Sequence, residues 1–226
     1  LAIAAAAEEV SRRHGFGGSV QMRRFPLQCD RAVVVSGRAG GIPSFFDSAV
    51  GGVGANPLAG MGAGFNKLQP SQPILVDLVH VHRGYVVDAT RMYSIGRLSE
   101  AWEQRLSDMT EVSDSVVASL GRGDDCSKAW EVGSQLANSM GYHEHLMGME
   151  PDQSKFLGHS VGLQLDESPV VAKGFDRRLI KGGVMAIEPK LVYPDGSIGI
   201  EDTWLQTDEG LEKITHETNN QWLTYC

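Results

Sequence analysis

Hydrophobic and polar positions recur with two different periods along the chain, and these periods predict both helices and strands. Apolar residues spaced three and four apart predict helices over residues 1–14, 99–120 and 126–140. Ser99 is a suitable N-cap for the second helix, and glutamates in its first turn suit the positive end of the helix dipole. Runs rich in β-branched and aromatic residues predict strands over 19–22, 32–36, 74–82, 85–93, 156–165, 184–193 and 197–206.

Two short links predict antiparallel hairpins, because such a short link cannot carry the chain back to the opposite end of the sheet, as a parallel pairing would require. One is the pair Arg83-Gly84, and the other is the turn at residues 194–196. Residues 37–64 hold so much glycine, alanine and proline that they predict a long loop, either a binding or lid segment or a solvated excursion. The order of elements predicts an α+β fold with an antiparallel sheet and two similar halves in series.

Composition narrows the class of protein. With 226 residues, one domain over residues 1–226 is the simplest expectation. The net charge of −8 comes without a run of lysine or arginine, so neither nucleic acid nor a membrane surface is an expected partner. Cys29, Cys126 and Cys226 form no CxxC pair, which favours a reducing, cytoplasmic setting. Because residue 1 lies inside a helical pattern with no N-cap before it, we expect the chain to be a fragment of a longer protein.

Two aspartates stand in otherwise apolar strands of the first predicted hairpin. If Arg83-Gly84 form a two-residue turn, residue 77 pairs with 90 and 79 with 88, so Asp77 and Asp88 share one face about 7–8 Å apart. Two buried carboxylates this close resist ionising together unless a cation lies between them. The alternative is that Arg91 or a lysine neutralises them.

The second predicted hairpin repeats this arrangement with glutamates. Glu188 and Glu201 lie in apolar strands and come close to facing each other if the turn centres on residues 194–195. His159 lies between two glycines, which allow close approach of backbone or substrate. Four carboxylates and an imidazole suit two hard or borderline divalent ions such as Mn, Co, Fe or Zn.

The motifs around these positions resemble the signature of the pita-bread metallopeptidases. They are Asp77 and Asp88 separated by ten residues and followed by Thr90-Arg91, Gly158-His159-Ser160-Val161-Gly162-Leu163, Ile187-Glu188-Pro189 and Ile200-Glu201-Asp202. Within that family the chain is most similar to the Xaa-Pro aminopeptidase and prolidase branch, through Gly84-Tyr85, Asp88-x-Thr90-Arg91 and Glu188-Pro189-Lys190.

This resemblance implies a curved antiparallel sheet backed by helices, with pseudo-twofold halves and a dinuclear site at its centre. Asp77 would hold one ion, His159 and Glu188 the other, with Asp88 and Glu201 bridging them. Manganese is the favoured metal, and a metal-activated water is the implied nucleophile. Glu188 would also be the catalytic proton shuttle. The implied activity is hydrolysis of Xaa-Pro bonds in short peptides, by a homodimer whose subunits often carry a further N-terminal domain, which this chain is expected to lack.

Three positions depart from the family pattern. Asp166 stands seven residues after the metal histidine, where the branch usually has a second histidine, and is expected to contact substrate. Ser44 stands where the branch has a histidine after a proline, and Gly199 where an arginine often precedes the last glutamate by two residues. An enzyme acting on a non-peptide molecule, such as an amidinohydrolase or lyase, and a non-catalytic binding protein therefore stay open as alternatives.

Overall fold

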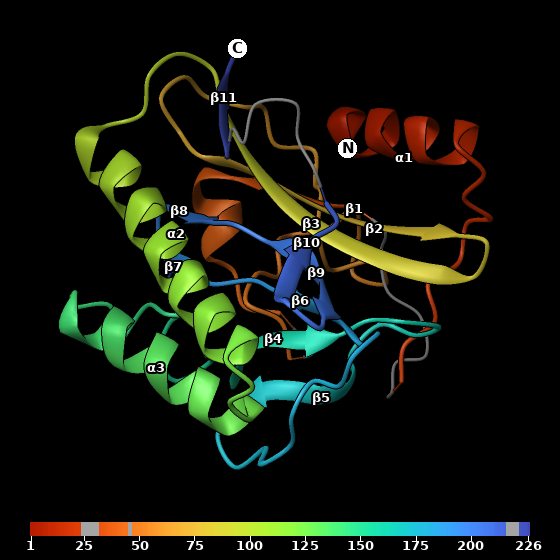
Figure 1. Cartoon of the computed structure of the whole chain (residues 1–226). Helices are drawn as coiled ribbons and strands as arrows, with labels where there is room; N and C mark the ends of the chain where they lie inside the picture. The colour runs from red at the N-terminus through yellow and green to blue at the C-terminus, as the bar shows by residue number, and fades with distance from the viewer. Residues whose placement is uncertain (24–31, 45–46, 216–221) are drawn as a thin grey trace.

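Helices and antiparallel strands are packed in layers in this computed structural model, which describes residues 1–23, 32–44, 47–215 and 222–226. Helices α2 (Glu100–Gly121) and α3 (Cys126–Ser139) lie side by side over one face of the strands. Helix α1 (Ala2–Arg13) lies on another side of the molecule, against the N-terminal strand (Figure 1). The predicted α+β class is confirmed.

The first sheet has the strand order β1-β2-β3-β11, comprising β1 (Ala32–Ser36), β2 (Ile74–His82), β3 (Tyr85–Ser94) and β11 (Leu223–Tyr225). Strands β2 and β3 form the predicted hairpin, and residue 77 pairs with 90 and 79 with 88 as expected. Arg83 and Gly84 have φ angles of 52° and 92°. Positive φ at both central residues matches a turn whose twist follows that of the flanking strands, which fixes this register. Strand β11, which pairs in parallel with β3, was not predicted.

The second sheet has the order β10-β9-β6-β4-β5 and is antiparallel throughout. Its strands are β4 (Phe156–Ser160), β5 (Glu167–Ala172), β6 (Val184–Ile187), β9 (Asp202–Thr207) and β10 (Gly210–Lys213). The predicted strand over 156–165 was too long, since β4 ends at Ser160. Strands β5 and β10 were missed.

A short separate hairpin, β7 (Lys190–Tyr193) with β8 (Gly196–Gly199), carries the second pair of glutamates at its base. The long strands predicted over 184–193 and 197–206 were therefore wrong, because each is broken in the middle. Pro189 cannot donate a ladder hydrogen bond, which explains the break between β6 and β7. Tyr193 pairs with Gly196, so the turn is centred on residues 194–195 as expected.

Three smaller expectations also need correction. Residues 19–22 form no strand, only a bridge between Met22 and Leu165. Ser99 is at the N-cap of α2, but its side chain makes no capping hydrogen bond. Residues 37–64 begin with a short 3₁₀ helix, η1 (Gly37–Gly41), packed so closely on the β7–β8 hairpin that a Cβ at Gly41 would lie 2.4 Å from the carbonyl oxygen of Tyr193. Cys29 lies outside the described residues.

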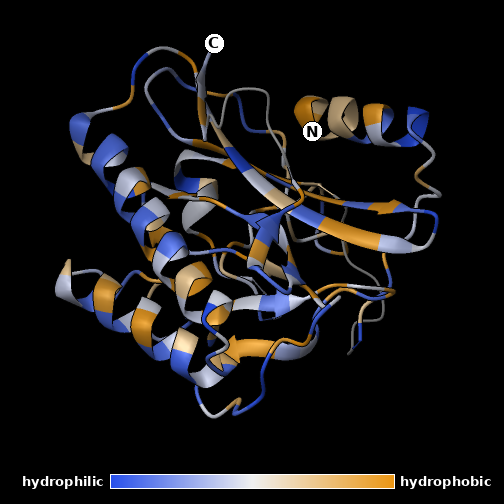
Figure 2. Cartoon of the chain, viewed as in Figure 1, coloured by the Kyte–Doolittle hydropathy of each residue, from blue (hydrophilic) through white to orange (hydrophobic). Residues whose placement is uncertain are grey.

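The core lies between the two long helices and the second sheet. Figure 2 shows hydrophobic positions recurring along α2 and α3 between hydrophilic ones. In α2, Met109, Val112 and Val116 are fully buried, and they meet Met185 of β6 and Leu157 of β4, which are at most 1% exposed. Burying each such side chain stabilises the fold by about 1.5–3 kcal/mol. This core holds β4 and β6 in place, and these strands lead to His159 and Glu188.

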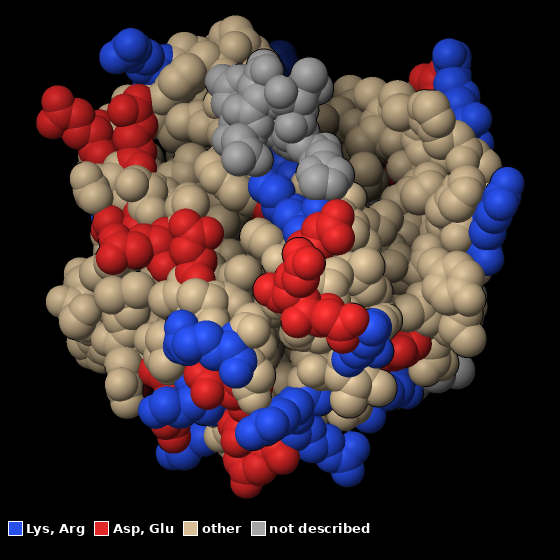
Figure 3. All heavy atoms as spheres, in the orientation of Figure 1, with Lys and Arg blue, Asp and Glu red and all other residues tan. Residues whose placement is uncertain are grey.

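The surface mixes charges of both signs. On the face shown in Figure 3, acidic side chains gather in several groups and basic side chains lie among and beside them. None of the helices in the described part of the chain is long and apolar enough to cross a membrane.

Candidate metal centre

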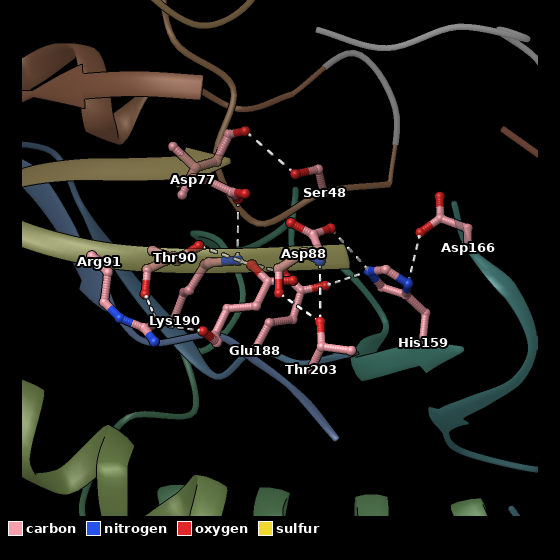
Figure 4. Close-up of polar contacts among 12 residues, drawn as sticks. Ser48, Asp77, Asp88, Thr90, Arg91, His159, Asp166, Glu188, Lys190 and Thr203 are labelled. Carbon is pink, nitrogen blue, oxygen red and sulfur yellow. Dashed lines mark hydrogen bonds and ion pairs between the residues drawn. The ribbon is translucent and has the colours of Figure 1, made fainter. Parts of the chain in front are cut away.

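The five predicted metal ligands line one small cavity, of about 50 Å³, where the two sheets meet. They are Asp77 of β2, Asp88 of β3, His159 of β4, and Glu188 and Glu201 at the base of the β7–β8 hairpin. Four of them are at most 6% exposed, and the side chain of Asp77 is 20% exposed. One water needs at least about 10–15 Å³, so this cavity has room for an ion and a few waters. Figure 4 labels four of them, Asp77, Asp88, His159 and Glu188, and shows how these four side chains converge.

The convergence follows from strand register. The β2–β3 turn puts Asp77 and Asp88 on one face of the first sheet. Lys190 pairs with Gly199, and extending that register two residues back puts Glu188 opposite Glu201. The two pairs are joined by Thr90, whose backbone N–H donates to the Glu201 carbonyl (3.3 Å) and whose hydroxyl donates to Glu201 Oε2 (2.8 Å).

His159 points one ring nitrogen toward Asp88 and Glu188 and the other toward Asp166 (Figure 4). Nε2 is 3.4 Å from Glu188 Oε1 and 3.9 Å from Asp88 Oδ2. Nδ1 is 3.6 Å from Asp166 Oδ1. A carboxylate behind a histidine is the usual arrangement that orients the imidazole toward a metal. Asp166 also lines the cavity, so its predicted contact with substrate stays a prediction.

Two buried carboxylate oxygens in the cavity have no hydrogen-bond partner among the described residues. They are Asp88 Oδ1 and Glu201 Oε1. One ligand atom each from Asp88, His159 and Glu201 lie within 4.8 Å of one another. Buried oxygens of this kind require a partner, and a hard or borderline divalent cation supplies one. The donor set therefore fits a divalent ion at this position.

The sequence analysis missed Lys190, which places an ammonium group in the same cluster. Its Nζ donates to Glu188 Oε2 (2.6 Å), Glu201 Oε2 (2.7 Å) and, at 3.3 Å, Asp77 Oδ2. The alternative that a lysine neutralises the acids is thus realised at Asp77. The signal was present, because a lysine flanked by apolar residues two positions after Glu188 has the same strand orientation as that glutamate.

Arg91, the other cation considered as a counter-charge, is used elsewhere. One guanidinium nitrogen donates to the carbonyl of Glu201 (2.7 Å) and another to Asp202 Oδ1 (2.8 Å). Thr203, also missed, accepts from the Asp88 backbone N–H (3.1 Å) and donates to the Asp88 carbonyl (2.7 Å). These bonds fix the backbone beneath the ligands rather than neutralising them.

The acids of the cavity differ in pKa. Burial, together with Glu201 and the other nearby carboxylates, raises the pKa of Asp88 well above its usual range. Burial, with repulsion from Glu188 and Asp77, raises the pKa of Glu201 to about 8 despite Lys190. Glu188 is also buried, but Lys190 and His159 outweigh this and lower its pKa to about 2.

The pKa of His159 shifts in the direction opposite to the one that burial alone would produce. Burial alone would lower the pKa of His159, but the carboxylates of Glu188 and Asp166 outweigh it and raise the pKa to about 9. The neutral imidazole that binds metal must therefore lose this proton, as Asp88 and Glu201 must lose theirs.

Of the other two departures from the family pattern, Ser44 does not line the cavity, and its hydroxyl is 3.9 Å from Met61 Sδ. Gly199 lies on β8 directly opposite Lys190.

Comparison with known proteins identifies the family of this chain. The model of metallopeptidase family M24 matches residues 2–208. The chain belongs to metallopeptidase family M24. An Xaa-Pro dipeptidase of Lactobacillus delbrueckii subsp. lactis is 28% identical over 174 residues, covering 76% of this chain and 45% of the relative. That of Lactobacillus helveticus is 27% identical, covering 72% and 42%. The resemblance to the Xaa-Pro branch is confirmed, although the chain spans less than half the length of these relatives.

Solved structures of M24 enzymes share the fold. The X-Pro aminopeptidase of Thermotoga maritima MSB8 superposes over 98% of this chain and 54% of its own with a TM-score of 0.78 at 22% identity. The Xaa-Pro dipeptidase of Bacillus anthracis gives 0.69 at 21% identity, over 98% and 60%. The methionine aminopeptidase of Rickettsia prowazekii gives 0.60 at 14% identity, over 82% and 73%. The pita-bread fold is therefore confirmed.

Proposed function

We propose that this protein is a metal-dependent peptidase that hydrolyses short peptides at an Xaa-Pro bond. The observation that carries the proposal is that four carboxylates and one imidazole converge in one buried cavity. Two of the carboxylate oxygens have no hydrogen-bond partner among the described residues. Membership of family M24 and similarity to Xaa-Pro dipeptidases support the peptide substrate. A divalent ion in such a site polarises a carbonyl group and lowers the pKa of water.

We assign different roles to the residues of the cavity. Asp88, His159 and Glu201 hold the ion, and Asp166 orients the imidazole from behind. Glu188 lines the cavity and is ionised at neutral pH, since its pKa is about 2. We assign it to accept the proton of the attacking water and pass it to the leaving amine. The prediction of a second ion and of manganese as the preferred metal stays a prediction, as do the cytoplasmic location, the single domain and the homodimer.

The function is tested by assaying metal-stripped protein with and without Mn²⁺, Co²⁺ or Zn²⁺. The substrates are an Xaa-Pro dipeptide, a longer peptide beginning Xaa-Pro and the same peptides with alanine in place of proline. Cleavage that needs metal and prefers proline supports the proposal. Release of product from a non-peptide amidine or thioether acid, without peptide cleavage, would support the amidinohydrolase or lyase alternative.

The role of Glu188 is tested by Glu188→Ala, with Glu131→Ala on the exposed face of α3 as the matched control. Loss of the proton acceptor is expected to lower kcat by about 10²–10⁴-fold, while the control stays at the wild-type rate. Unchanged turnover in Glu188→Ala would refute the assignment. Light scattering of the purified protein tests the homodimer separately.

A further inference from the structure

Lys190 has the surroundings of a bound cation. It is 1% exposed, and its ammonium group lies among one oxygen each of Glu188, Glu201 and Asp77. An isolated ammonium in such a place would be very costly, so these three carboxylates are its counter-charges. They are also three of the five predicted metal ligands, and Lys190 therefore competes with metal for the same atoms.

We infer that Lys190 permanently occupies one of the two cation positions of this centre, so that the protein binds a single divalent ion at Asp88, His159 and Glu201. The inference rests on the proposed metal-dependent function and specifies its stoichiometry. It departs from the dinuclear centre that the family resemblance implies.

Glu188 and Glu201 each direct one carboxylate oxygen toward the ammonium position and the other toward the proposed ion position. Oε2 of Glu188 and Oε2 of Glu201 accept from Lys190. On the other side, Glu188 Oε1 faces the imidazole of His159, and Glu201 Oε1 has no partner among the described residues. Asp88 Oδ1, also without a partner there, belongs to this second position. The cluster thus has one position filled by the ammonium and one whose buried donors still require a cation.

Gly199 provides the space that Lys190 fills. A Cβ at Gly199 would lie 2.6 Å from the Cα and 2.8 Å from the Cγ of Lys190, so any side chain there would displace the lysine stem. The two residues are direct partners on β7 and β8. The arginine that the resemblance leads one to expect at position 199 is absent, and this chain instead brings its cation from the opposite strand.

A second divalent ion could enter only by displacing this ammonium. The two cations would need the same oxygens of Asp77, Glu188 and Glu201, and their like charges would repel each other at such close range. The lysine is 1% exposed, and its ammonium group contacts Glu188 (2.6 Å), Glu201 (2.7 Å) and Asp77 (3.3 Å), so displacing it would break all three contacts.

The test measures metal content, not activity. Wild-type protein and Lys190→Ala are loaded with Mn²⁺, passed through gel filtration and analysed by elemental mass spectrometry and electron paramagnetic resonance. Wild type is expected to hold one ion per chain with the spectrum of isolated Mn²⁺. Lys190→Ala is expected to hold two, with the spectrum of a spin-coupled pair. Lys181→Ala, which removes an exposed lysine paired with Asp208, is the matched control and should match wild type.

Asp77→Asn provides a second measurement if Lys190→Ala does not fold. Because Asp77 contacts Lys190 and not the proposed ion position, this variant should keep one ion with affinity close to wild type. Two ions in wild type, one ion in folded Lys190→Ala, or loss of the ion in Asp77→Asn would each overturn the inference. An absence of ions in wild type would overturn the proposed function as well, so the two failures are distinguishable.

Discussion

Replacing Asp166 by asparagine separates two roles for this carboxylate. The family position predicts a contact with substrate, whereas the geometry places Asp166 Oδ1 3.6 Å from His159 Nδ1. Asparagine keeps the shape and also tolerates the left-handed backbone, since Asp166 has a φ of 59° and alanine would add strain there. The variant thus removes the charge with little other change.

The size of the effect follows from the contact. Losing the carboxylate that orients a metal-binding histidine typically weakens metal affinity by about 10–100-fold, or about 1.4–2.7 kcal/mol. At a fixed metal concentration well above Kd, the stabilisation by metal falls by the same amount. For a chain of this size, that corresponds to a loss of about 3–11 °C from the metal-induced rise in Tm.

The assay is a titration of metal-stripped protein with Mn²⁺, followed by calorimetry and by thermal unfolding. Asp208→Asn, at an exposed ion pair, is the control and should bind metal like wild type. Peptide hydrolysis at saturating metal gives KM for the same proteins. If Asp166→Asn binds metal normally but has a raised KM, Asp166 is a substrate contact and the reasoning from the structure is refuted.

Three further outcomes are expected. Between pH 6.5 and 8, the unfolding free energy of the metal-free protein should fall by about 1.4 kcal/mol per pH unit for each proton involved. The reason is that folded Glu201 (pKa about 8) and His159 (pKa about 9) keep protons that the unfolded chain releases at lower pH. Urea midpoints that rise with pH would contradict this. Gly133→Ala should destabilise by about 1–3 kcal/mol because its Cβ would lie 2.6 Å from a buried side chain of α2, whereas Gly121→Ala, with no neighbour nearer than 3.8 Å, should not. Thr90→Val removes the 2.8 Å hydrogen bond to Glu201, so it should cost about 1–3 kcal/mol and weaken metal binding in calorimetry, and unchanged values for both would show that this bond does not position the glutamate.

The sequence was most informative where local rules determine geometry. The two-residue turn at Arg83-Gly84 fixes register, so the pairing that brings Asp77 beside Asp88 could be predicted to the residue. The same period-two argument placed Glu188 opposite Glu201, although the strands it assumed are interrupted at both glutamates.

The remaining features depend on packing that local patterns do not record. Strand β5 begins Glu167-Ser168-Pro169, which gives no alternation of polar and apolar residues, and only its pairing with β4 makes it a strand. Asp166 reaches His159 through the loop between those strands, and sequence spacing does not define such a path. Lys190 differs, because its position two residues after Glu188 already indicates that it shares the strand orientation of that glutamate.

The spread of the ligands along the chain has a consequence for how the protein is made. Asp77 and Glu201 are separated by more than half the chain, and both sheets must be present before the cavity exists. Until residue 201 has left the ribosome, the nascent chain lacks one of the five side chains and cannot form the complete centre, even when metal is present. The proposed peptidase activity therefore depends on synthesis having passed residue 201, because no shorter N-terminal segment holds all five side chains.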